Sequence, residues 1–163
     1  MIKADDLREF RPVVRYQNGE GITLSTVQDA IQDCADKLGI PVAFRGDQVK
    51  SGGLFNSSVE DCVVLYHPEH QWDYYNICLR VKHQGNFAFV SINDFGKSKL
   101  EGNAGSRDFL KETIRHGSGA EKVGALIGAG ARRLVMGGAN KQKLEEEQNY
   151  YACLMDIFDE IVS

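Results

Sequence analysis

Long apolar segments, basic clusters and close cysteine pairs are all missing from this sequence. The longest uninterrupted run of apolar and glycine residues, 124–131, is far shorter than the roughly 20 residues that a membrane-spanning helix needs. The first ten residues, MIKADDLREF, contain no apolar stretch typical of a signal peptide. These absences exclude an integral membrane protein and predict a cytoplasmic one.

The four cysteines, Cys34, Cys62, Cys78 and Cys153, form no CxxC pair, so neither a zinc ribbon nor a thioredoxin motif is available. With 163 residues, 42% of them apolar, the chain is long enough to bury a core without disulfides. We therefore expect buried, reduced thiols. The net charge of -4 and the lack of a basic tail disfavour nucleic-acid binding, because neutralising phosphates requires clustered lysine and arginine.

Length and composition predict one domain, residues 1–163. Residues 12–17 have the pattern of a strand, and a helix with a Ser25/Gln28 capping box is expected to end at Gly39. A short strand over 42–45 follows, and the glycine- and serine-rich residues 46–58 are expected to be irregular.

Residues 60–95 contain three strand patterns with no room for a helix between them, which predicts an antiparallel meander. A two-residue type II′ turn at Gly85-Asn86 pairs Gln84 with Phe87. A short loop over 68–72 then places Cys62 opposite Cys78. This register collects the apolar side chains on one face, the expected main core, which comprises Val63, Leu65, Ile77, Leu79, Val81, Val90 and Ile92.

After residue 95 the composition changes, since ten of the seventeen glycines lie between 96 and 138. Apolar spacing nevertheless predicts helices starting at Ser106, over 120–136 and over 141–162. The last two have opposite charge and are expected to pack as a hairpin. The predicted fold is therefore α+β, with an N-terminal helix and a C-terminal helical hairpin on an antiparallel sheet of four or five strands; residues 1–95 hold the helix and sheet, and residues 96–163 the glycine-rich linker and helices.

Two groups of residues have the chemistry of a binding site. His67, His70 and Asp73 offer imidazole and carboxylate ligands that suit zinc, nickel or iron, although they lie on a predicted hairpin loop. Arg132 and Arg133, next to a glycine-containing segment, offer an anion site.

The second sheet face is expected to be aromatic and cationic. The segment 87–92 (FAFVSI) resembles the second half of the RNP1 motif of RNA-recognition domains, whose aromatic side chains stack on bases. The resemblance covers six residues and implies weak single-stranded RNA or nucleotide binding at Phe87 and Phe89. We favour the alternative that a C-terminal helix covers both rings. The candidate ligand-binding residues on this face are Tyr66, Tyr74, Arg80, Phe87 and Phe89.

Catalytic motifs such as GxSxG, SxxK and HExxH do not occur. The leading hypothesis is a noncatalytic cytoplasmic module that binds a protein partner, or a small and partly apolar ligand, between the sheet and the C-terminal helices. Homodimerisation through the last helix is a subsidiary hypothesis. The alternative from another class is a metal-dependent enzyme that uses His67, His70 and Asp73.

Overall fold

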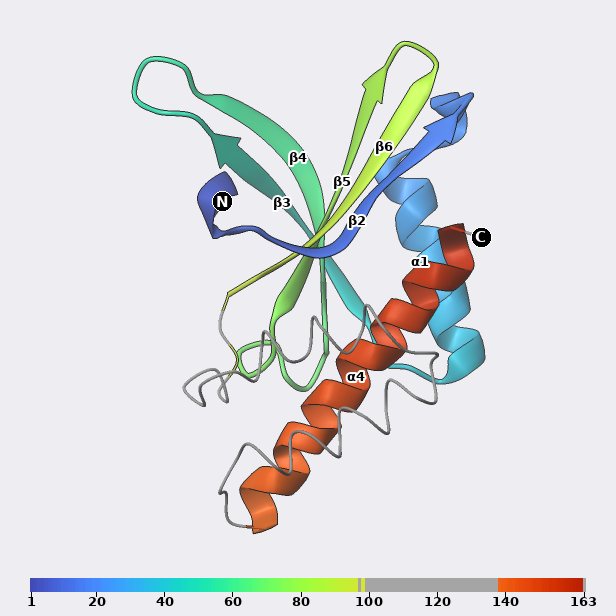
Figure 1. Ribbon diagram of the computed structural model, residues 1–163, viewed down its shortest axis with the longest axis vertical. Helices are drawn as coiled ribbons and strands as arrows, with labels where there is room; N and C mark the ends of the chain where they lie inside the picture. Colours follow the sequence, from blue (N-terminus) through green and yellow to red (C-terminus); the bar gives the residue numbers. More distant parts are fainter. Residues whose placement is uncertain (97, 99–137, 163) are drawn as a thin grey trace. The chain divides into compact units, whose positions relative to one another are not determined.

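The computed structural model describes residues 1–96, 98 and 138–162, which belong to two compact units, Met1–Lys97 and Ser98–Ser163. The first unit contains a six-stranded sheet and helix α1, Leu24–Leu38 (Figure 1). The described part of the second unit is helix α4, Gly138–Val162. The α+β class expected from the sequence is therefore confirmed.

The sheet has the strand order β1-β3-β4-β5-β6-β2. Its strands are β1 (Ile2–Lys3), β2 (Arg8–Gln17), β3 (Ala43–Ser51), β4 (Ser58–Tyr66), β5 (Asn76–Gln84) and β6 (Phe87–Phe95). All neighbours are antiparallel except β1 and β3, which are parallel, so the prediction of a purely antiparallel sheet is wrong. Strand β1 has only two residues, and a pairing so short leaves no period-two pattern in the sequence.

Strand β2 is the outer strand at the other side of the described sheet. Among the described strands it pairs with β6 alone, and its register shifts twice, between Glu9 and Arg11 and between Arg11 and Val14. Pro12, which has no backbone N–H to donate, lies within the second of these irregular stretches. The 3-10 helix η2 (Gly19–Gly21) connects β2 towards α1, and a second one, η1 (Ala4–Asp6), follows β1.

The β5–β6 register is the one predicted from the sequence. Gln84 lies opposite Phe87, and the pairs Val81–Val90 and Leu79–Ile92 follow. Gly85 has a φ of 57° and Asn86 is not in the positive-φ region, as a type II′ turn requires.

The β4–β5 register differs from the prediction by two residues. Val64, rather than Cys62, lies opposite Cys78, so the predicted direct pairing of the two cysteines is wrong. The reason is the connection over 67–75, which folds into successive turns that end with buried Tyr74 and Tyr75 instead of continuing the strands. A shift of two residues keeps every side chain on its predicted face.

The two cysteines still contact each other, because both lie on the same face and their thiols form a hydrogen bond. This hydrogen bond and burial raise the pKa of the Cys78 thiol, which therefore stays protonated at neutral pH. All four cysteines are free, and three are buried, as expected.

The expectation of irregular structure over residues 46–58 is wrong for most of that range. β3 continues to Ser51 and β4 begins at Ser58, which pairs with it, so only the tip between them is a loop. Several residues of this part of β3 are poor strand formers by themselves, among them Gly46, Asp47 and Lys50. Their strand conformation depends on pairing with β4.

Helix α1 begins two residues earlier than its predicted cap indicates. Thr23, not Ser25, is the N-cap: its hydroxyl accepts a hydrogen bond from the Thr26 N–H, and the Thr23 N–H donates one to the Thr26 hydroxyl. The helix ends, as predicted, at Gly39 in the left-handed conformation. Its buried residues are Ile31, Cys34 and Ala35.

Both faces of the sheet carry buried apolar side chains. The predicted core face holds Leu65, Ile77, Leu79, Val90 and Ile92, all buried, and α1 packs against β4 and β5. The second face was expected to be semi-polar, yet part of it forms a separate apolar cluster, which α1 does not join. This second cluster comprises Ile2, Val49, Cys62, Val64 and Cys78, with Ala4, Leu7, Tyr66 and Phe95 packed against it.

Helix α4 confirms the helix predicted over 141–162, and the residues of its apolar stripe from Leu144 to Phe158 are buried. The helix predicted over 120–136, which would complete the hairpin, lies outside the described residues, as do Arg132 and Arg133. Within the described residues, no helix combines the length and the apolar character needed to cross a lipid bilayer.

Candidate ligand-binding face

Five side chains from three strands form a strip on the second sheet face, beyond the apolar cluster. We call Arg15, Arg80, Lys82, Phe87 and Phe89 the aromatic–cationic strip. Arg15 and Lys82 both lie opposite Phe89, one on each side of β6. Because the side chains of paired residues lie on the same face of a sheet, this register brings the strip together from β2, β5 and β6.

The aromatic rings of the strip are partly exposed, and an arginine side chain lies over one of them. The Phe87 and Phe89 centroids lie 6.5 Å apart, and both side chains are half-buried. The Arg15 guanidinium carbon lies 5.4 Å from the Phe87 centroid, within the range of a cation–π contact. Stacking holds the guanidinium against the ring and leaves its N–H groups directed to the sides.

Glu60 of β4 anchors the other two cations. Its Oε2 lies 3.5 Å from Arg80 Nη1 and 3.2 Å from Lys82 Nζ. Arg80 Nη2 also donates a hydrogen bond to Asn93 Oδ1, at 3.0 Å. Three positive side chains and one carboxylate give this region a surplus of +2 (3 - 1), in a chain whose net charge is -4.

The structure brings together three of the five predicted ligand-binding residues, Arg80, Phe87 and Phe89. Tyr66 lies on the same face but packs against the apolar cluster, with the Arg45 guanidinium carbon 5.6 Å from its ring. Tyr74 was expected on this face within a strand. It lies instead in the connection between β4 and β5, where it is buried.

The predicted metal ligands are neighbours in that same connection. The rings of His67 and His70 meet edge to face with centroids 4.7 Å apart, and His70 stacks on Tyr74 at 4.2 Å. His70 Nδ1 lies 3.5 Å from Asp73 Oδ2, whereas His67 Nδ1 accepts a hydrogen bond from the Glu69 N–H. Among the described residues, no three His, Cys, Asp or Glu side chains converge as a metal site, and the metal hypothesis stays a prediction.

His67 titrates at a lower pH than an exposed histidine. Burial and the neighbouring His70 both lower its pKa, since each disfavours the charged imidazolium. The ring is therefore neutral at neutral pH.

Two features of the surface escaped the sequence analysis. Arg15 was placed in a strand, but its stacking on Phe87 depends on the long-range pairing of β2 with β6, for which no local signal exists. Leu54 and Phe55 fall in the segment expected to be irregular. The signal that could have identified them is a pair of large apolar residues between Gly-Gly and Asn-Ser-Ser, two groups typical of an exposed turn.

Comparison with known proteins adds no assignment, because no protein-family model, no curated protein and no solved structure matches this chain.

Proposed function

We propose that this chain is a noncatalytic binding module whose aromatic–cationic strip binds an acidic, partly apolar segment of a protein partner. The observation that carries the proposal is the stack of Arg15 on Phe87 beside half-exposed Phe89 and well-exposed Lys82. Arginine and aromatic side chains are the residue types that contribute most to protein interfaces.

The geometry favours a ligand with both charge and apolar surface. The surplus of +2 attracts carboxylates, and Arg15 is well suited to bind one through paired N–H groups. The Phe87 and Phe89 rings offer apolar area next to these charges, so an aliphatic or aromatic side chain can pack there while a neighbouring carboxylate pairs with the cation. The strip supplies charge and stacking, and its lysine is held in an ion pair with Glu60, which is why we propose binding rather than catalysis.

A peptide array tests the proposal directly. Peptides in which aspartate or glutamate alternates with leucine or aromatic residues are expected to bind, whereas lysine-substituted versions are not. The variant Arg15→Ala/Lys82→Ala should bind the selected peptides about tenfold or more weakly, because it removes both of the more exposed cations. The matched control, Lys37→Ala/Lys50→Ala, removes the same charge from exposed positions outside the strip and should bind normally.

Two results would count against this function. If the control variant loses binding as strongly as the strip variant, the attraction is general charge and not a site. If the protein instead binds AMP or oligouridine, and Phe87→Ala/Phe89→Ala abolishes that binding while the chain stays folded, the nucleotide alternative replaces the protein-segment proposal.

A further inference from the structure

The outer half of the β3–β4 hairpin extends away from the rest of the sheet. β3 and β4 pair continuously from Ala43 and Tyr66 out to Ser51 and Ser58, but β4 pairs with β5 only over Val63–Leu65. Beyond that pairing, the outer half pairs with β1 at Val49 and Lys50, and the Glu60 side chain forms ion pairs with Arg80 and Lys82 of β5. Figure 1 shows the two hairpins, β3–β4 and β5–β6, diverging above this shared region.

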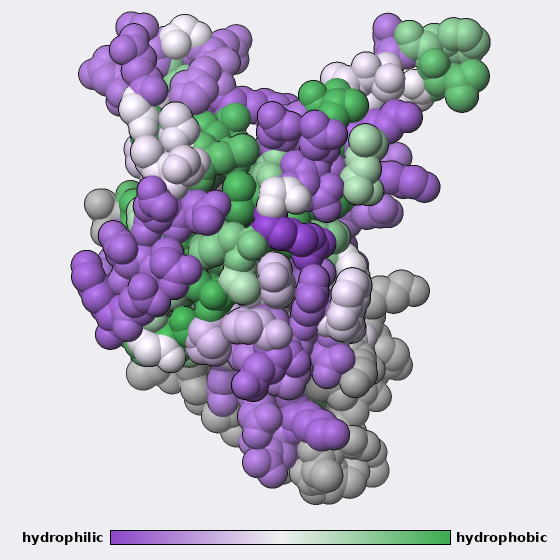
Figure 2. Space-filling model, turned by 180° about the vertical axis from the view of Figure 1, so that it is seen from behind, coloured by the Kyte–Doolittle hydropathy of each residue, from purple (hydrophilic) through white to green (hydrophobic). Residues whose placement is uncertain are grey.

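The tip of this hairpin carries the two most exposed large apolar side chains of the described residues. Leu54 is 95% exposed and Phe55 is 96% exposed. Figure 2 shows hydrophobic surface concentrated at the end of the projecting arm, separated by paler surface from a smaller hydrophobic patch nearer the body of the molecule. Single exposed apolar residues are ordinary, but two adjacent ones at the end of a projection form an isolated apolar knob.

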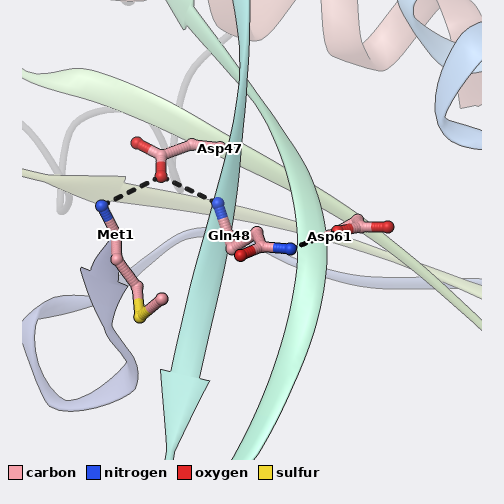
Figure 3. Close-up of polar contacts among 4 residues, drawn as sticks. All are labelled: Met1, Asp47, Gln48 and Asp61. Atoms are coloured by element: carbon pink, nitrogen blue, oxygen red, sulfur yellow. Dashed lines mark hydrogen bonds and ion pairs between the residues drawn. The ribbon is translucent and has the colours of Figure 1, made fainter.

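The arm is held in place by specific contacts along its length. Gln48 Nε2 donates to Asp61 Oδ1 across the two strands at 3.0 Å, and the Asp47 carboxylate accepts from the Gln48 N–H at 2.8 Å (Figure 3). The Met1 amino group lies 3.1 Å from the same carboxylate, and Val49 is fully buried in the second apolar cluster. The knob is therefore presented on an anchored support.

The loop that carries the knob is itself tightly closed. Gly52 has a φ of 87°, and a Cβ there would lie 1.9 Å from the carbonyl oxygen of Asn56. Only glycine permits this approach of the two sides of the loop. A loop whose conformation is set in advance loses less entropy on binding than a flexible one.

The charges around the knob identify what kind of surface it fits. Lys50 is the single charged residue from 50 to 59, and Asp47, Glu60 and Asp61 lie behind it. An anionic membrane surface attracts clusters of lysine and arginine, and this arm lacks such a cluster. An uncharged tip with two apolar side chains matches an apolar pocket on a protein.

We infer that the β3–β4 hairpin tip is a protein-docking element, which inserts Leu54 and Phe55 into an apolar pocket of a partner protein. This surface is distinct from the aromatic–cationic strip, and the inference does not depend on the function proposed for the strip. The polar walls of the arm remain outside the pocket and determine how deeply the tip enters.

Site-specific photo-cross-linking in extract of the source organism tests this inference. Benzoylphenylalanine replaces Phe55 in the full chain, and a matched chain carries it at Trp72, another large apolar residue, 84% exposed, in the connection between β4 and β5. We expect a discrete protein adduct at position 55 and none of that size at position 72. Unlabelled wild-type chain should compete for the adduct, whereas Leu54→Ser/Phe55→Ser should need a concentration about tenfold or more higher. Circular dichroism and thermal unfolding verify that this variant folds.

The other outcomes overturn the inference. Equal labelling at positions 55 and 72, or equal competition by the wild-type chain and the Leu54→Ser/Phe55→Ser variant, shows that the tip has no specific pocket. An adduct between two copies of this chain identifies a self-association contact instead. Co-sedimentation with phosphatidylcholine–phosphatidylglycerol vesicles, lost in the same variant, identifies a lipid-inserting tip.

Discussion

Replacing Gly19 by alanine should destabilise this protein for a purely steric reason. Gly19 is buried in η2, and a Cβ placed on it would lie 2.4 Å from the Ala88 Cβ and 2.7 Å from the Ala88 backbone nitrogen. Neither atom belongs to a flexible side chain, so the main chain of η2 or β6 must shift. Overpacking of this kind costs about 1–3 kcal/mol. The shift would also strain the hydrogen bond that the Gly19 N–H donates to the Asn86 carbonyl, at 3.0 Å.

The same 3-10 helix contains its own control. Gly21 has no atom within 4 Å of its missing Cβ and, like Gly19, has no positive φ, so Gly21→Ala should change the free energy of unfolding by less than about 0.5 kcal/mol. Urea denaturation gives both values, with equal slopes expected for the two variants. Adding Ala88→Gly to Gly19→Ala removes the clashing methyl group. The two changes should therefore be less costly together than their sum, by about 0.5 kcal/mol or more.

If Gly19→Ala is as stable as Gly21→Ala, the space around Gly19 accommodates a methyl group and no steric clash exists there. If Ala88→Gly and Gly19→Ala are simply additive, the added Cβ is not opposed by the Ala88 methyl group, and the backbone of residue 88 alone accounts for the cost. Since η2 directly follows β2, this contact contributes to the alignment of β2 with β6 that places Arg15 on Phe87.

Three further predictions concern the cap of α1 and the histidines. In urea denaturation, Thr23→Ala should lower the free energy of unfolding by about 1 kcal/mol, and Ser25→Ala by less than about 0.5 kcal/mol. A larger loss for Ser25→Ala would show that Ser25, the residue predicted from the sequence, is the N-cap. Burial and His70 lower the pKa of His67, so below about pH 6.5 the unfolded chain binds a proton at this residue more readily than the folded chain does. The free energy of unfolding should therefore fall as the pH decreases. His67→Gln should reduce that slope in denaturation curves recorded from about pH 7.5 to 5, and an unchanged slope would assign it to other groups. The metal hypothesis predicts stoichiometric zinc binding that His70→Ala or Asp73→Ala abolishes, and elemental analysis that finds no bound metal after zinc addition would exclude it.

The parts of the fold that follow short-range rules could be predicted from the sequence. The Gly85-Asn86 turn determines the β5–β6 register because a two-residue loop leaves one pairing. The alternation of apolar residues then assigns the faces, and this assignment is unaffected by the two-residue error at Cys78. The length of the 67–75 connection was not predictable, since it depends on how Tyr74 and Tyr75 become buried.

Long-range pairing accounts for what the sequence analysis missed. Val49 and Ile2 lie far apart in the chain, and neither has neighbours that indicate a parallel strand or a second core on that face. The candidate site likewise has one part that local sequence patterns predict and one part that depends on long-range pairing. Phe87 and Phe89 were predicted to share a face with Arg80 from local alternation, whereas Arg15 joins them only because β2 returns to pair with β6.

The irregular path of β2 has a consequence for the behaviour of the protein in concentrated solution. An outer strand normally offers a continuous row of backbone donors and acceptors to which a strand of another molecule can add. Here the two register shifts twist that row out of line, and Pro12 removes one donor from it, next to exposed Val13. The part of β2 that stays regular, Val14–Gln17, is short and ends at η2, so along this side the sheet is a poor template for aggregation.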